Sequence, residues 1–77
     1  MKNYITVYTT VSSTEEAKKI SCGLVETKLA YCVNTIPSIQ STYLWDGKLC
    51  IDDELLLIIK TKEEKFFSFF HLLDPAN

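Results

Sequence analysis

The sequence predicts a small α+β fold whose elements follow the order strand, helix, strand, strand, helix. A strand-like run at residues 4–9 precedes a capped amphipathic helix, and an Asp46-Gly47 turn joins two further strand patterns. The apolar run at residues 55–59 is typical of a central strand buried on both faces. The 77 residues form one domain, 1–77, with a small core. A chain of this size buries only roughly 60% of its unfolded surface, which favours oligomerisation.

The first strand and the helix are predicted from residue type and capping. Residues 4–9 are rich in aromatic and β-branched side chains, which favour strands. Ser13 and Glu16 form a capping box, in which each side chain can bond the backbone N–H of the other. Apolar residues then recur at helical spacing to about residue 30, and the predicted buried face consists of Ala17, Ile20, Leu24, Val25 and Leu29.

Two strands flank the Asp46-Gly47 turn, which is a strong hairpin signal because both residues adopt positive φ at little cost. Pro37 removes a hydrogen-bond donor from the first of these strands, so an edge position or a bulge is expected there. On the returning strand, the acidic residues 52–54 predict a solvated bend or edge.

The end of the chain predicts a second capped helix. Thr61 is the expected N-cap and Glu64 the expected N3 residue, and a phenylalanine-rich segment follows as far as Asp74-Pro75. The resulting β-α-β-β-α order is a ferredoxin-like split βαβ unit without its final strand. That strand would flank the first one, so residues 4–9 are expected to form an exposed edge.

The composition argues against several classes of partner. The net charge is −2 with both signs mixed, and the absence of a basic stripe argues against nucleic acid. No apolar run approaches the roughly 20 residues of a membrane span. Cys22, Cys32 and Cys50 are odd in number and widely spaced, and the first residues begin a strand pattern without a signal-peptide core. We therefore expect a reduced, cytoplasmic protein.

Several segments resemble the CutA family of divalent-cation tolerance proteins, in order and spacing, from about residue 4 to residue 65. The most specific are LAYCVNTIP at residues 29–37 and STYLWDGKL at residues 41–49. The resemblance implies a ferredoxin-like fold and a compact, P-II-like homotrimer, in which the long second and third strands pair with neighbouring subunits. It also implies a role in tolerance of copper or other divalent cations, without an established catalytic reaction.

The resemblance fades towards the C-terminus. The family continues after its second helix with a His-Pro-Tyr segment, another strand and a final helix, which do not appear before Asn77. We therefore expect residues 70–77 to be a non-family tail of a truncated or mis-spliced chain. Intact-mass analysis of the natural protein checks this expectation, and a mass matching 77 residues would contradict it.

Cys32 is the candidate metal ligand, because thiolates suit copper(I) and zinc. The alternative is a small buried residue, since free cysteines are often buried, and the metal-linked cysteine of some relatives corresponds to Tyr8 here. His71, the only histidine, is expected on a helix flank rather than at a metal. The acids at 52–54 suit weak divalent binding, but alternation along a strand turns the middle one away from the other two.

The remaining site candidates suit a cleft between subunits. An aromatic pair with lysines can hold a small anion, or the aromatic residues can serve as interface anchors; Glu54 can pair with a lysine of a neighbouring subunit. These candidates are Tyr43, Trp45, Lys48, Glu54 and Lys60.

Taken together, the residues and the resemblance predict a cytoplasmic homotrimer that binds divalent metal, copper first. The alternative is a P-II-like signalling or scaffold trimer that binds a small anion or a protein partner at its intersubunit cleft. Because no catalytic triad, Cys-His pair or glycine-rich phosphate loop can be argued from the sequence, we do not expect an enzyme.

Overall fold

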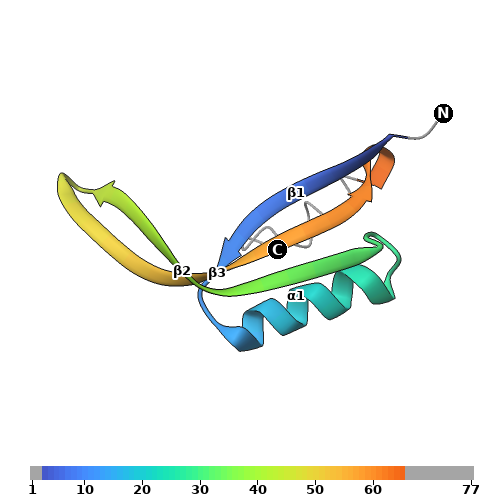
Figure 1. The fold of residues 1–77 in the computed structure, drawn as a ribbon, viewed down its shortest axis with the longest axis horizontal. Helices are drawn as coiled ribbons and strands as arrows, with labels where there is room; N and C mark the ends of the chain where they lie inside the picture. The colour runs from blue at the N-terminus through green and yellow to red at the C-terminus, as the bar shows by residue number, and fades with distance from the viewer. Residues whose placement is uncertain (1–2, 66–77) are drawn as a thin grey trace.

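The computed structural model describes residues 3–65, which form a three-stranded antiparallel sheet with one helix against it (Figure 1). The elements are β1 (Tyr4–Val11), α1 (Thr14–Glu26), β2 (Cys32–Trp45), β3 (Lys48–Lys62) and a short 3-10 helix, η1 (Glu63–Lys65). The sheet order is β1-β3-β2, so the apolar run at 55–59 lies in the central strand, as predicted. Over these residues, the expected α+β, ferredoxin-like arrangement is confirmed.

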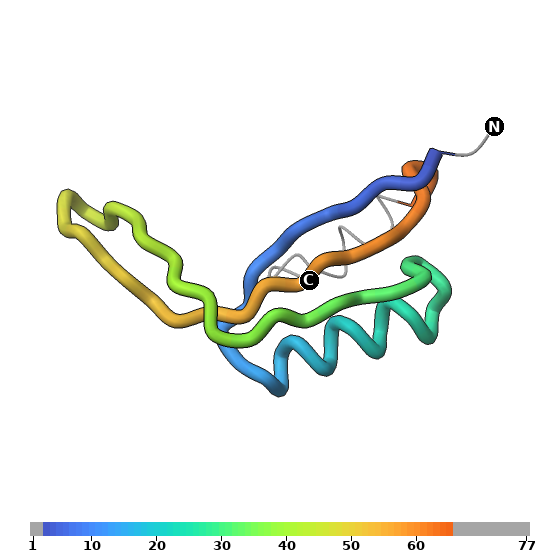
Figure 2. Tube along the Cα trace, viewed as in Figure 1, coloured from blue at the N-terminus to red at the C-terminus, as the bar shows by residue number. Residues whose placement is uncertain are grey.

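Strands β2 and β3 extend well beyond β1. Pairing between β1 and β3 stops at Val11↔Leu55, whereas β2 and β3 stay paired as far as Trp45↔Lys48. Residues 39–54 therefore form a two-stranded extension, which we call the arm. Figure 2 shows the arm bending away from the rest of the sheet, which makes the molecule elongated, with extents of 45 × 23 × 22 Å.

The base of the arm coincides with a bulge in β2. The register between β2 and β3 shifts between Ile36 and Ile39, and Ser38 adopts a positive φ of 62°. Pro37 cannot donate to the ladder, and an extra residue in one strand bends the ribbon locally. The predicted bulge is confirmed, and β2 is also an edge of the described sheet.

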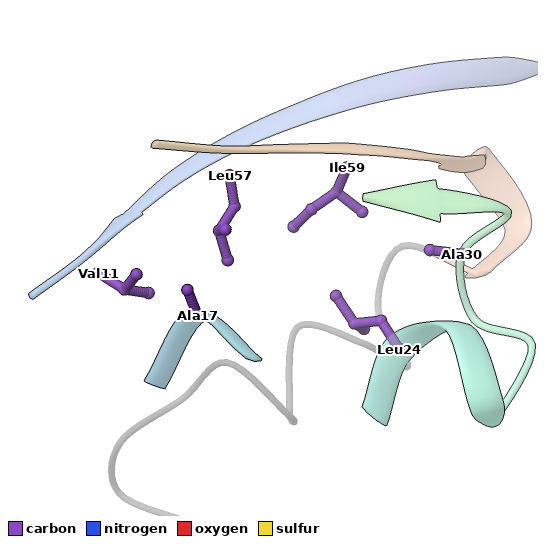
Figure 3. Close-up of a cluster of buried hydrophobic side chains, with 6 residues drawn as sticks. All are labelled: Val11, Ala17, Leu24, Ala30, Leu57 and Ile59. Atoms are coloured by element: carbon purple, nitrogen blue, oxygen red, sulfur yellow. The ribbon is translucent and has the colours of Figure 1, made fainter. Parts of the chain in front are cut away.

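The core lies between α1 and one face of the sheet (Figure 3). Side chains alternate along a strand, so Leu57, Ile59 and Thr61 of β3 all point towards α1. We call the opposite side of the sheet the far face. The buried cluster consists of Val11, Ala17, Leu24, Ala30, Leu57 and Ile59.

Helix α1 begins as predicted. The Ser13 hydroxyl accepts a hydrogen bond from the backbone N–H of Glu16 at 3.1 Å, as an N-cap does. The Glu16 carboxylate, however, accepts from the backbone N–H and the hydroxyl of Ser12, at 3.1 and 3.3 Å, rather than from the N–H of Ser13. The reciprocal hydrogen bond of the capping box therefore joins Glu16 to Ser12 instead of Ser13.

The end of α1 differs from the prediction. The helix stops at Glu26 rather than near residue 30, because Lys28 adopts a positive φ of 63°, typical of the left-handed residue that ends a helix. Leu29 still packs against the core from outside the helix. Val25, in contrast, is 42% exposed, so its assignment to the buried face is wrong.

Strand β3 runs without interruption through the acids at 52–54, which lie at the base of the arm, where the ribbon bends away from the rest of the sheet (Figure 2). Each acid is paired with β2, from Ile39↔Glu54 to Ser41↔Asp52. Because β1 ends opposite Leu55, the acids lack β1 on their other side and are at an edge, which was the other predicted possibility.

The predicted N-cap at Thr61 is also wrong. Thr61 is a buried residue of β3, and its hydroxyl donates to the carbonyl of Leu29. Pairing with β1 up to Tyr4↔Lys62 extends the strand past the Thr-x-x-Glu pattern, and Glu64 lies in η1. The second helix predicted beyond η1, the 70–77 tail and His71 lie outside the described residues.

None of the helices within residues 3–65 combines the length and apolar character that crossing a membrane requires.

Candidate functional site

Register places every predicted site residue of the described chain on the far face of the sheet. Residues an even number apart share a face of β3, and residues directly opposite in an antiparallel pair share a face as well. Leu57 and Ile59 point towards α1, so the even-numbered residues of β3 point away from it. The far face therefore carries Lys48, Glu54 and Lys60 of β3, together with their neighbours Trp45, Tyr43 and Cys32 of β2.

The tip of the arm brings three of these residues together. Asp46 and Gly47 adopt φ values of 54° and 76°, which confirms the tight hairpin turn. Trp45 and Lys48 face each other directly behind the turn, and Tyr43 follows one pair further along the same face. Trp45 is 72% exposed, so a single chain does not enclose these side chains in a cleft.

Tyr43 is fixed on the arm by a contact that the sequence did not reveal. Its hydroxyl donates to the carboxylate of Asp52 across the two strands. This hydrogen bond first, and then desolvation, raise the pKa of Tyr43 to about 12. The phenol therefore remains protonated near neutral pH, and one carboxylate of the acidic run is already engaged. The cross-strand register would have revealed the pair of Tyr43 and Asp52, but the sequence alone does not determine that register.

The remaining candidates lie elsewhere on β3. Glu54 is opposite Ile39 at the base of the arm, and Lys60 lies between Thr6 and Cys32 in a row across the three strands. Lys48 and Lys60 thus stand near opposite ends of one strand. One chain does not gather the five cleft candidates, so a shared cleft requires neighbouring subunits.

Cys32 is half-buried, and its thiol lies 3.8 Å from the Asn34 side-chain oxygen, a weak hydrogen-bond contact. Within residues 3–65, no three histidine, cysteine, aspartate or glutamate side chains lie close enough to hold a metal ion. Asp53 points to the face opposite Asp52 and Glu54, as alternation predicts. A copper site built on Cys32 therefore needs ligands from a neighbouring subunit or from outside the described range.

The structure also groups three residues that the sequence analysis did not. The rings of Tyr4 and Tyr31 lie with their centroids 5.4 Å apart, tilted by 43°. The Lys62 ammonium lies 5.9 Å from the first ring and 5.8 Å from the second, within cation–π range. The pairing Tyr4↔Lys62 and the bond from the Tyr31 N–H to the Lys60 carbonyl, at 2.9 Å, create this corner. Both contacts depend on the register between distant segments, so no local sequence pattern predicts this corner.

Comparison with known proteins gives a consistent result. The family model described as CutA1 divalent ion tolerance protein matches residues 5–74. The chain is 51% identical over 59 residues to the chloroplastic protein CutA of Arabidopsis thaliana. The aligned residues cover 77% of this chain and 32% of that protein. The chain thus spans about a third of the length of this plant relative.

Solved structures agree with the family match. The divalent cation tolerance protein (Cut A1) of Thermus thermophilus superimposes with a TM-score of 0.87 at 40% identity, covering 91% of this chain and 68% of that chain. CutA from Synechococcus elongatus, complexed with a Bis-Tris molecule, superimposes with a TM-score of 0.85 at 32% identity. The match covers 95% of this chain and 67% of that chain.

Proposed function

The chain belongs to the CutA1 family of divalent ion tolerance proteins, and we propose that it acts as a homotrimer that binds copper or another divalent cation. Family membership is the observation that carries this proposal, and the proposed role is metal-ion tolerance and homeostasis. The proposed compartment is the cytoplasm, because Cys22, Cys32 and Cys50 are all free thiols, as is usual where glutathione keeps cysteines reduced.

The arm supports the oligomeric part of the proposal. Leu44, Trp45 and Leu49 are 71%, 72% and 68% exposed, so apolar side chains cover both faces of the tip. A two-stranded ribbon is marginal by itself in water, and large apolar side chains exposed together on such a ribbon are typical of an interaction site. Pairing between the arm and neighbouring subunits would bury these side chains.

Cys32 supports the metal part of the proposal. A thiolate is a soft donor that selects copper(I) or zinc over calcium and magnesium. Its half-buried position on the far face, in the same row as Lys60, leaves the sulfur within reach of a bound ion. In the proposed trimer this thiol would occur three times.

Titration calorimetry of the full chain with copper(I), copper(II) and zinc tests the metal proposal. We expect saturable copper binding that weakens at least about tenfold in Cys32→Ser, because a direct ligand is lost. Cys22→Ser is the matched control, since this exposed thiol lies on α1 and should not affect affinity. Absence of copper binding, or equal loss in both variants, would contradict the metal proposal; light scattering that returns a monomer would contradict the trimer.

A second function is favoured by the shared orientation of Tyr43, Trp45, Lys48 and Lys60. An aromatic pair and two lysines on one face suit a small anion or a protein partner in a cleft between subunits. The Synechococcus relative, which was solved with Bis-Tris, is a CutA protein holding a small organic molecule. Retained anion or partner binding in a chain that does not bind copper would favour this signalling or scaffold function, and Lys60→Gln should then weaken it.

A further inference from the structure

The arm joins the body of the fold at one level of the sheet, which is marked by Leu55 of β3. On one side of β3, pairing with β1 ends at Val11↔Leu55. On the other side, the ladder with β2 is interrupted at the same level, between residues 36 and 39. Both neighbours of β3 therefore lose their regular pairing together, and Figure 2 shows the arm bending away from the body here. We call this level the junction.

The junction contains one extra residue on β2. Across the interruption, β2 advances from residue 36 to residue 39, whereas β3 advances only from residue 56 to residue 54. Pro37 and Ser38 thus stand together opposite Leu55. Two residues opposite one define a β-bulge, which bends the strand that contains it and increases the local twist.

The pairing on either side of the junction does not require the extra residue. If Ser38 were deleted, Pro37 alone would stand opposite Leu55, and every pair observed in the body and in the arm could be kept in an unbroken ladder. The faces could be kept as well, because Ile36 and Ile39, which share the far face, would then be two positions apart. The bulge therefore changes the path of the ribbon rather than its register.

The extra residue has a local cost. Ser38 adopts a φ of 62°, in the left-handed region that glycine populates freely and that a residue with a Cβ avoids. The bulge also disrupts the hydrogen-bond ladder between β2 and β3. Burial of the two side chains does not offset these effects, since Pro37 and Ser38 are both exposed. Backbone strain that is kept at an exposed position is typical of residues that serve a function.

We propose that Ser38, as the extra residue of β2, sets the direction in which the arm leaves the body, and that chains assemble through the arm only when it has this direction. The inference rests on the proposed homotrimer, because it assigns the bend to contact with a second copy of the chain. Trwo exposed apolar residues, Leu44 and Trp45, lie near the tip. The tip is about 20 Å along the strand from the junction, so a change of angle at the junction is amplified there.

Deletion of Ser38 from the full chain tests the proposal, because it separates the bend from the register. Residual dipolar couplings of the backbone N–H groups measure the angle between the arm and the body. We expect a bent arm in the parent chain and a straighter one in the variant, with the cross-strand contacts Tyr43↔Cys50 and Trp45↔Lys48 retained. In sedimentation analysis, the variant should need at least about tenfold more protein than the parent chain to assemble.

Ser38→Gly is the matched control. It keeps the extra residue and removes the Cβ that the left-handed conformation disfavours, so the bend and the assembly should both be retained. Deletion of Pro37 provides a second test, because it also removes the extra residue but leaves a serine that can donate to the ladder. It should reproduce the effects of deleting Ser38. Circular dichroism of α1 shows whether each variant is folded.

The outcomes separate this inference from the proposed trimer. An unchanged arm angle in both deletion variants would overturn the inference, as would a straightened arm on chains that assemble normally, and the trimer would survive either result. Unfolding of both variants would also overturn it, since pairing would then require the extra residue. A monomeric parent chain would contradict the trimer and the assembly step with it, whereas an angle that still changes on deletion would support the role of Ser38 in directing the arm.

Discussion

The two halves of β3 both contain large apolar residues but have very different surroundings. Along residues 56–60 the strand is paired on both sides and covered by α1, and Leu57 and Ile59 are fully buried. Along the arm it is paired with β2 alone, and Leu49 and Ile51 are exposed. Leu49 and Ile51 are the same residue types as Leu57 and Ile59, so their exposure reflects the partners available to each half. The body of the fold is thus buried within one chain, whereas the apolar residues of the arm remain exposed in a single chain.

The largest effect is expected from truncation in the body. Leu57→Ala should lower the free energy of unfolding by about 2–5 kcal/mol, because it leaves a cavity between β3 and α1. That is a large fraction of the stability of a small domain. Urea denaturation followed by circular dichroism measures the change. Leu49→Ala, the same change on the arm, should alter unfolding only to the extent that assembly is weakened. An equal loss in both variants at all protein concentrations would contradict the contrast between the two halves.

Truncation at the tip of the arm should act on assembly instead. In the proposed trimer, Trp45→Ala should cost about 2 kcal/mol or more per interface, as buried aromatic anchors do. Sedimentation analysis should show dissociation at protein concentrations where the parent chain remains assembled, with the helical signal of α1 preserved. Thr42→Ala, an exposed position of the same ribbon, is the control. A Trp45→Ala protein that assembles normally would show that the tip is not an interface.

The elements that local chemistry dictates could be predicted from the sequence. The Asp46-Gly47 turn, the Ser13 cap and the bulge at Pro37 each depend on a few neighbouring residues, and all three are present. Thr61 was misassigned because its Thr-x-x-Glu pattern satisfies a local helix signal, while the competing pairing with β1 comes from the other end of the chain. The end of α1 near Lys28 was not predicted because a lysine, rather than the usual glycine, occupies the left-handed position after the helix.

The candidate site shows the same division between local and long-range information. Strand alternation, once the register is known, places Tyr43, Lys48 and Lys60 on one face. The Tyr43–Asp52 bond and the corner of Tyr4, Tyr31 and Lys62 depend on that register and could not be read from spacing. Whether the arm candidates form one cleft would depend on the neighbouring subunits of the proposed trimer, about which a single sequence carries only indirect signals.

A smaller effect is expected from removing the hydrogen bond that Thr61 of β3 donates to the Leu29 carbonyl in the loop after α1. Thr61→Val should lower the free energy of unfolding by about 1–3 kcal/mol, because the shape is kept while the part-buried carbonyl of Leu29 loses its donor. Denaturant midpoints at fixed protein concentration measure this change. Thr42→Val, on the exposed arm, should stay within about 0.5 kcal/mol. If Thr61→Val leaves the free energy of unfolding unchanged, water replaces the hydroxyl as the donor to Leu29. This end of the core is then more open to solvent than the region around Leu57.

The smallest effect concerns the protonation of the arm. Hydrogen bonding to Asp52 raises the pKa of Tyr43 from 10.0 to about 12, so the folded chain holds this proton more tightly than the unfolded chain. The resulting stabilisation is fully present below pH 10 and is lost as the pH rises towards 12, since the unfolded state then binds fewer protons. Because Tyr43 is exposed, solvent screening keeps the contribution small. Carbon-13 titration of the tyrosine rings should show the pKa of Tyr43 falling towards 10 in Asp52→Asn, while α1 and the body are unaffected. If the resonance of Tyr43 titrates identically in both proteins, the cross-strand bond does not hold the arm in solution, and the ribbon owes its geometry to the turn and to the pairing of β2 with β3.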